Sequence, residues 1–476
     1  MPSPVVERMS RVDTAWLRMG SDVNLMMIVG VWLLRPSIAH AALCERVEQK
    51  LLQYDRFRQK VVQDATGADW VPDSSFDIRA HVLAERLQAT EAEDPRAALQ
   101  RRVGELANTA LDARKPLWQF HLIEGYEGGS ALIARVHHCI GDGIALISVM
   151  LSITDGGIDP PKLKRRARKK EGGDWLADAV MRPLADLSTK ALGLYDESLS
   201  KSLDLLANPH EGLLGSIDKA RMAYRVLGDM AAMALMPDDS PTFLKGKPEG
   251  RKVVAWSEPL PLDRVKWIGK ALDCSINDVL LGCVAGAIGD YLREEGDDPT
   301  HKEIRAMVPV NLRPPGEAWQ LGNRFGLAPL MLPIGIGNPV ERVYAVRARM
   351  NELKTSYQPL LAFGVLSVAG LMAKPVQDAI LGLFAKKATA VMTNVPGPAV
   401  PLELCGSTLE QTMFWVPASG DVGVGVSILS YAGGVQFGLI VDRALCADPQ
   451  AIIDRFEPEF EQLLWLALML PWGGID

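Results

Sequence analysis

The composition of the chain changes abruptly after Asp155, and this change divides the sequence into two halves. A run typical of a linker, residues 156–161, leads into residues 162–170, of which seven are Lys or Arg. On both sides of this connector, short apolar runs bounded by turn residues alternate with stretches of helical periodicity. We therefore predict a mixed α/β (α+β) fold in three parts: an N-terminal half at 1–155, a basic and helical connector at 156–248 and a C-terminal half at 249–476.

The apolar patterns place individual elements in each half. In the first half we expect strands over 23–34, 118–124 and 130–139, and helices over 37–54, 95–111 and 144–150. A serine is expected to cap the helix that starts at Ser37. In the second half we expect strands over 253–256, 304–310, 388–393, 422–429 and 435–441, and helices over 262–272, 276–293, 339–353 and from about 449.

Composition excludes several classes of protein. A chain of 476 residues that is 48% hydrophobic can bury a large core, which excludes a disulfide-stapled miniprotein and a disordered chain. The net charge of −7 argues against a general nucleic-acid binder. None of the six cysteines forms a CxxC pair or a zinc-like spacing, and no signal-peptide pattern is apparent, so we expect a cytoplasmic protein with free thiols.

Two apolar segments bear on contact with membranes. No uncharged apolar run reaches the roughly 18 residues that span a bilayer. Residues 360–373 and 460–472 suit either buried core helices or helices that lie against a membrane surface. The basic run at 162–170 is either a solvated connector or a site for anionic lipid head groups or phosphate-bearing ligands.

The segment Val136-His137-His138-Cys139-Ile140-Gly141-Asp142-Gly143 is the main candidate for a functional site. The chain lacks the G-x-S-x-G, P-loop and G-x-G-x-x-G patterns, which disfavours a serine hydrolase, a P-loop NTPase and a Rossmann dehydrogenase. Because the two histidines end a strand, they should project to opposite faces, so only one faces a given cavity and a shared metal is disfavoured. Asp142 falls at a helix N-terminus, where it can cap the helix, fix the loop that positions the imidazole, or do both.

These residues match the HHxxxDG signature of the CoA-dependent acyltransferase superfamily. Further matches run in order along nearly the whole chain, and with them the sequence resembles the bacterial wax ester synthase/diacylglycerol acyltransferases. The matching segments are Pro116-Leu117-Trp118, Asn277-Asp278, Val308 to Arg313, Gly322-Asn323, Thr393 to Pro398, Ser430-Tyr431, Phe437-Gly438 and Asp442. One departure concerns substrate preference: family members commonly carry Pro-Met-His near the N-terminus, where this chain has Asn24-Leu25-Met26-Met27.

The resemblance implies two halves of similar fold with an active-site channel between them. It implies that His138 is the general base, that Asp142 is structural and ion-paired to Arg313, and that Gly143 keeps the helix start close to the channel. Asn277 is expected to stabilise the oxyanion or hold the acceptor, with a helix N-cap as the alternative role. Trp118 and Asn394 are expected to orient the channel walls. Cys139 has no evident activator, so an acyl-enzyme on its thiol is disfavoured.

The function implied is transfer of a fatty acyl group from acyl-CoA, as substrate and without a cofactor, to diacylglycerol or a long-chain alcohol. The alternatives are a condensation-type or polyketide-associated acyltransferase, and a catalytically silent lipid-binding member of the fold. The expected partners are the two lipid substrates and, by peripheral contact, a membrane or lipid inclusion; a homodimer is left open.

Overall fold

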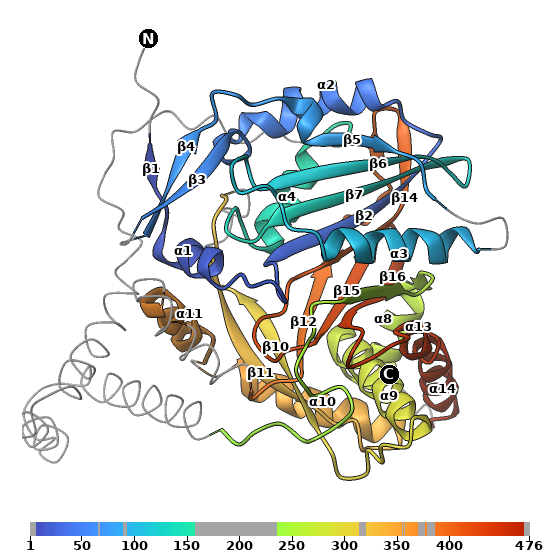
Figure 1. Ribbon diagram of the computed structural model, residues 1–476. Coiled ribbons are helices and arrows are strands. Elements are labelled where there is room, and N and C mark those ends of the chain that lie inside the picture. Colours follow the sequence, from blue (N-terminus) through green and yellow to red (C-terminus); the bar gives the residue numbers. More distant parts are fainter. Residues whose placement is uncertain are drawn as a thin grey trace, which may run out of the picture.

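The computed structural model describes residues 6–64, 67–88, 93–157, 236–313, 320–354, 356, 358–369, 377 and 386–470. The basic run at 162–170 and almost all of the helical pattern predicted over 174–236 lie outside these residues. The described residues form two halves, each a sheet with helices, stacked one on the other (Figure 1). The division into a domain, a connector and a second domain at the stated boundaries stays a prediction.

The sheet of the N-terminal half has six strands in the spatial order β13, β14, β2, β7, β6 and β5. Their bounds are Glu403–Leu404, Ser407–Trp415, Met27–Arg35, Gly129–His137, Trp118–Tyr126 and Val82–Glu85. Strand β7 lies inside the sheet and all nine of its residues are buried, as its nearly continuous apolar run predicts. The helices of this half are α2 (His40–Lys50), α3 (Pro95–Ala107) and α4 (Gly143–Ser152).

The sheet of the C-terminal half has seven strands, with β11, β10, β12, β15, β16 and β8 in order and β9 paired to β16. The bounds of these strands are Phe325–Leu332, Ile304–Asn311, Ala390–Pro396, Val424–Tyr431, Gly434–Asp442, Lys252–Trp256 and Leu260–Pro261. The helices are α8 (Leu262–Ala271), α9 (Ile276–Glu294), α10 (Pro339–Lys354), α11 (Gln358–Ala369), α13 (Gln450–Ile453) and α14 (Phe456–Met469).

A third, small sheet lies at the N-terminal edge of the molecule, next to the helix α1 (Arg11–Arg18) (Figure 1). It consists of β1 (Glu7–Arg8), β4 (Gly67–Pro72) and β3 (Gln59–Asp64), in that order. Ser10 caps α1 by accepting a hydrogen bond from the Asp13 N–H. Helix α1 packs against α11 and so lies where the two halves meet.

Strand β14 joins the two halves, because it belongs to the C-terminal half in sequence and to the N-terminal sheet in space. It pairs antiparallel with β2 over most of its length, from Thr408 opposite Arg35 to Trp415 opposite Val29. β13 directly precedes β14 and pairs with it, whereas β12 before this pair and β15 after it lie in the other sheet (Figure 1). A segment near residue 410 therefore completes a sheet built by the first 137 residues.

Several sequence predictions need correction. The helix over 37–54 begins only at His40 and has no side-chain cap, because Ser37 shares a hydrogen bond with Ser130 Oγ instead. The C-terminal helix divides into α13 and α14. Strands β5, β11 and β14, the small sheet and α1 were not predicted. β5 and the strand β1 of the small sheet carry too few residues for a periodic signal, and polar residues interrupt the apolar pattern of β14; β11 is a run of eight residues without a polar side chain, for which no strand was predicted.

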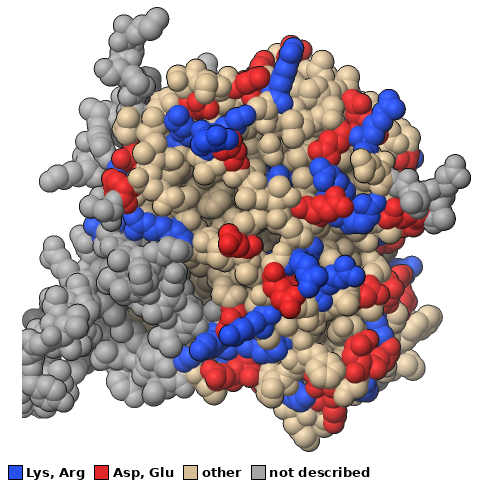
Figure 2. All heavy atoms as spheres, in the orientation of Figure 1, with Lys and Arg blue, Asp and Glu red and all other residues tan. Residues whose placement is uncertain are grey.

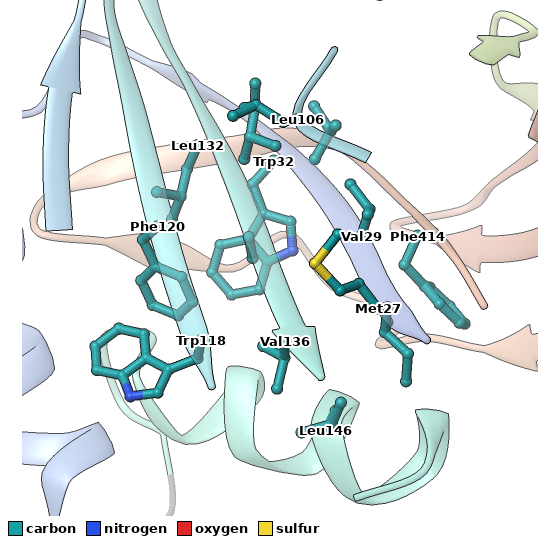
Figure 3. Packing of buried hydrophobic residues seen from close by; sticks show 14 of the residues in the cluster. Met27, Val29, Trp32, Leu106, Trp118, Phe120, Leu132, Val136, Leu146 and Phe414 are labelled. Carbon is teal, nitrogen blue, oxygen red and sulfur yellow. The ribbon is translucent and has the colours of Figure 1, made fainter. Parts of the chain in front are cut away.

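The core of the N-terminal half collects side chains from all of its layers (Figure 3). Met27 and Val29 of β2 lie beside Phe414 of β14, and Val136 of β7 lies above Leu146 of α4 (Figure 3). A second core of similar kind lies in the C-terminal half, around α9. On the face in Figure 2, acidic and basic side chains of the described residues are interspersed over a largely uncharged surface.

Among the described residues, no single helix is both long and apolar enough to cross a bilayer. By length and composition alone, one pair of helices, α8 with α9, would reach this size, and the two meet at an angle of 100°.

Candidate active site

The histidine pair lies where β7 ends, and each histidine makes different contacts. The His137 N–H donates to the Leu117 carbonyl (2.9 Å), and its Nδ1 accepts from the Cys139 N–H (3.2 Å). The His138 N–H donates to the Met26 carbonyl (2.8 Å). His138 Nδ1 is buried and has no hydrogen-bond partner among the described residues. His137 is therefore committed to the local turn, whereas His138 keeps a ring nitrogen for other chemistry.

Aromatic residues from both halves surround the His138 ring. The indole of Trp16 on α1 stacks on it with the ring centroids 4.1 Å apart and the planes 13° apart. Phe325 of β11 lies 5.7 Å from it at a tilt of 43°. The imidazole thus lies at the junction between the N-terminal half and the C-terminal sheet.

Burial determines the protonation of both rings. It lowers the pKa of His138 to about 4, and the nearby Asp142 carboxylate only partly opposes this shift. Burial and the neighbouring His138 lower the pKa of His137 to about 3. Both imidazoles are therefore neutral at pH 7, and a neutral imidazole is the form that accepts a proton.

Asp142 is held from three sides and serves the structure of the loop. One carboxylate oxygen accepts from the Ala145 N–H (3.0 Å) and so caps α4. The other accepts from Arg313 Nη1 (2.5 Å) and from the Arg324 N–H (3.0 Å). The ion pair that the resemblance implied is present, its two side chains are almost wholly buried, and it ties the loop to the C-terminal half.

Glycines bring the two halves together beside the histidines. Gly141 forms a parallel bridge with Gly322, whose N–H donates to the Ile140 carbonyl (3.0 Å). A Cβ on Gly143 would meet Phe414 of β14 at 3.6 Å, which is ordinary packing distance. The start of α4 thus lies directly against the strand that crosses from the C-terminal half.

An apolar cavity of about 80 Å³ lies between β7, α4 and β14. On β7 it is lined by alternate residues, Leu132, Ala134 and Val136, which share one face of the strand. His138 comes next in this alternation. Gly143 and Leu146 of α4 line the cavity as well. An elongated apolar group in this space would therefore run along β7; His138, which follows the end of this strand, does not line the cavity.

The other predicted site residues lie elsewhere. Asn277 and Asn394 contact each other, with Asn394 Nδ2 donating to Asn277 Oδ1 (2.9 Å) at the end of β12. Asn277 does not cap α9: Ser275 does so, in a capping box with Asp278, and the N-cap interpretation of Asn277 is wrong. Among the described residues no hydrogen bond joins Asn277, Asn394 or Asp278 to His138.

Trp118 and Cys139 are both fully buried. The indole N–H of Trp118 donates to the Phe57 carbonyl (2.9 Å), and its ring packs between His81 and Phe120. Burial raises the pKa of the Cys139 thiol well above its ordinary value, which disfavours the thiolate that a nucleophile requires.

Four residues around the histidine segment were not predicted as site residues. The rings of Trp16 and Phe325 lie against His138, Asn323 donates to the His138 carbonyl, and Asp13 accepts from Asn323. The spacing of Asp13 and Trp16, three residues apart, was the only available signal, because it places both on one face of a helix. Met26, which replaces part of the usual Pro-Met-His, supplies the carbonyl that accepts from His138.

Comparison with known proteins identifies first the fold and then the family. The structure superposes on the first condensation domain of the calcium-dependent antibiotic synthetase, with a TM-score of 0.56 and 15% identity, covering 98% of this chain and 97% of that one. It superposes on the wax ester synthase/diacylglycerol acyltransferase from Marinobacter aquaeolei VT8 with a TM-score of 0.65 and 21% identity, covering 97% and 100%. These likenesses confirm the predicted fold class.

The family follows from the sequence. Residues 9–280 match the wax ester synthase/diacylglycerol acyltransferase catalytic domain, and residues 321–464 match the WS/DGAT C-terminal domain. The chain is also 25% identical to tgs1, a probable diacylglycerol O-acyltransferase of Mycobacterium tuberculosis, over 96% of each chain. The chain belongs to the wax ester synthase/diacylglycerol acyltransferase family, as its motifs predicted.

Proposed function

We propose that the chain transfers a fatty acyl group from acyl-CoA to the hydroxyl group of diacylglycerol or a long-chain alcohol, with His138 as the general base. The observation that carries this proposal is a neutral, buried imidazole with an unpartnered Nδ1, at the end of the strand that lines an apolar cavity. Family membership supports the reaction class.

The reaction needs one proton to move twice. The His138 imidazole takes the proton of the acceptor hydroxyl as its oxygen forms a bond to the thioester carbonyl carbon. The tetrahedral intermediate collapses, the carbon–sulfur bond breaks, and the imidazolium returns the proton to the departing CoA thiolate. The products are an ester and free CoA, and no acyl-enzyme forms.

The apolar cavity offers a place for part of a fatty chain. Its lining residues on β7 and α4 offer no charged group, so an alkyl chain gains from leaving water there, and its volume of about 80 Å³ holds a few methylene groups. Because the cavity lies along the strand that ends at the histidine pair, we assign it to a part of the acyl chain of the donor.

The test is direct. Purified protein is incubated with radiolabelled palmitoyl-CoA and either hexadecanol or dioleoylglycerol, and lipid products are separated while free CoA is titrated. We expect labelled wax ester, triacylglycerol or both, in step with released CoA. Release of CoA without an ester, or no turnover with either acceptor in folded protein, contradicts the proposal.

We also propose that the enzyme works at a lipid surface and docks there through α14. Trp465, Leu468 and Met469 share one face of this helix and are 61%, 44% and 71% exposed. Replacing Trp465 and Met469 by Ser should weaken sedimentation with phosphatidylcholine–phosphatidylglycerol liposomes. Val400→Ser, at an exposed apolar residue of another segment, is the matched control. Equal sedimentation of both variants would count against this docking face.

A further inference from the structure

Two residues on one face of α1 are linked to His138, Trp16 directly and Asp13 through Asn323. Asp13 and Trp16 lie three positions apart, which is close to one helical turn, and both are buried. Neither is part of the HHxxxDG segment, and about 120 residues separate them from it in the sequence. Their links to His138 are therefore a product of the fold.

Trp16 covers one face of the His138 ring. Its indole lies 4.1 Å from the imidazole centroid and only 13° from parallel. Phe325 lies 5.6 Å from the same indole and 5.7 Å from the imidazole, so the three rings form one aromatic group. A stacked indole fixes the plane of the imidazole, and its negative face attracts a positive charge placed over it.

Asp13 acts on the His138 backbone through Asn323. One Asp13 carboxylate oxygen accepts from the Asn323 N–H (2.9 Å) and from its Nδ2 (2.7 Å), and the same Nδ2 donates to the His138 carbonyl (2.8 Å). Both of these side-chain contacts need a donor, which fixes the orientation of the Asn323 amide. The carbonyl of His138 is thereby held from the C-terminal half.

The charges near the ring leave the imidazolium with little direct support. Burial disfavours the protonated ring; the carboxylate of Asp142, the N-cap of α4, opposes this effect most, and the Asn323 side chain opposes it less. Asp142 is itself paired with Arg313 and Asp13 with Asn323, and the adjacent imidazole of His137 is neutral. When His138 becomes an imidazolium during acyl transfer, the nearby carboxylates are already paired. The aromatic face of Trp16 is therefore the group placed to stabilise its charge.

We propose that Trp16 and Asp13 are positioning residues for acyl transfer: the Trp16 indole stabilises the imidazolium that forms on His138, and Asp13 holds the His138 backbone through Asn323. This inference rests on the proposed function of His138. It assigns part of the proton-transfer step to α1, which lies against the C-terminal half.

The experiment compares an aromatic with an aliphatic replacement. Trp16→Phe keeps a π face over the ring, whereas Trp16→Leu fills space without one. We expect Trp16→Leu to lower kcat for hexadecanol by about 10-fold at unchanged KM, and Trp16→Phe to retain most of the rate. In parallel, Asp13→Asn keeps an acceptor for Asn323 and should retain activity, whereas Asp13→Leu should lose it.

A more acidic acceptor separates a role in proton transfer from a merely structural one. An alcohol such as 2,2-difluorohexadecanol needs less help from a base, so the loss in Trp16→Leu should shrink with it. An equal loss with both alcohols, or a kcat equal to wild type, overturns the inference. If Trp16→Leu does not fold, Trp16→Met replaces it as the aliphatic variant. If neither variant folds, the kinetics of Asp13→Asn and Asp13→Leu test the role of α1.

His138→Ala, run beside these variants, keeps the two proposals apart. Full activity in His138→Ala removes the proposed base, whatever the Trp16 variants do. Loss of activity in His138→Ala together with wild-type kinetics in both Trp16→Leu and Asp13→Leu leaves the base in place and overturns the role of α1.

Discussion

His138 lies where burial, more than any neighbouring charge, sets the protonation of its ring. With its pKa lowered to about 4, His138 is a weaker base than an ordinary histidine. It is, however, deprotonated over the whole physiological pH range. The lost basicity has to be recovered in the transition state, by groups that stabilise the imidazolium only when it forms.

The lowered pKa predicts the acid limb of the pH profile. We expect kcat/KM for the wild type to stay level as pH falls through 6.5, the ordinary histidine value, and to fall only toward an apparent pKa of about 4. The pH dependence of kcat/KM is measured from initial rates in stopped assays, and circular dichroism verifies folding at each pH. A limb centred near 6.5 would mean that the ring is more hydrated than the structure indicates.

The same shift has a consequence for stability. A folded-state pKa below the unfolded value contributes stability that is complete above about pH 6.5 and is lost as the pH falls toward 4. Activity and the free energy of unfolding should therefore decline over overlapping ranges at acid pH.

The ion pair between Asp142 and Arg313 predicts a large effect of removing one partner. Arg313→Met leaves a buried carboxylate without its cation, and we expect a loss of about 3–5 kcal/mol in the free energy of unfolding. Asp142→Asn in the same chain should recover part of that loss. Lys266→Met, which removes an exposed ion pair with Asp263, serves as the control and should cost under about 1 kcal/mol. Urea unfolding midpoints are compared for the wild type, Arg313→Met, the double variant with Asp142→Asn, and Lys266→Met. Equal midpoints for Arg313→Met and Lys266→Met would refute the structural role of the ion pair.

At the scale of elements, β7, α4 and β14 enclose the apolar cavity, and their geometry predicts a limit on chain length. Ala134→Leu adds three carbons to the wall at the middle of the β7 face. We expect it to raise KM for palmitoyl-CoA by about 10-fold or more, because the part of the long chain that enters this cavity is displaced, and to change KM for butyryl-CoA little. Ala134→Gly is the matched control. Parallel changes with both donors would place the acyl chain elsewhere.

The elements differ in how well the sequence predicts them. The strand, turn and helix around His138 follow from local signals: an apolar run, a Gly-Asp-Gly turn and an aspartate at the helix start. The partner of Asp142 followed from family position alone, since Arg313 is 171 residues away. The contacts of Trp16 and Asn323 could not be predicted, because they depend on how α1 and β11 pack.

At the scale of the whole molecule, β14 makes the two halves interdependent. The sequence divides at the connector, yet the sheet of the first half is completed by residues 403–415. The place of β14 in the N-terminal sheet follows from its long-range pairing with β2, which no local sequence pattern predicts. The histidine segment lies at the same junction, so the arrangement of the halves also sets the geometry around His138.

This interdependence predicts that residues 1–157 do not fold alone. Without β14, the edge of β2 is unpaired and the Phe414 side of the core is open. We expect the fragment to aggregate or to lack near-UV circular dichroism, and a second fragment, 236–476, to restore soluble material when co-expressed. A monomeric fragment with native-like spectra would contradict the role given to β14.

The proposed role of His138 in moving the proton during acyl transfer is tested most directly by kcat for His138→Ala with palmitoyl-CoA and the better acceptor. His301→Asn, at an exposed histidine with φ 60°, is the control for histidine replacement as such. We predict a fall in kcat of about 10²–10⁴-fold for His138→Ala, with wild-type folding, and no change for His301→Asn. A His138→Ala enzyme that forms ester at a rate close to that of the wild type would contradict the account.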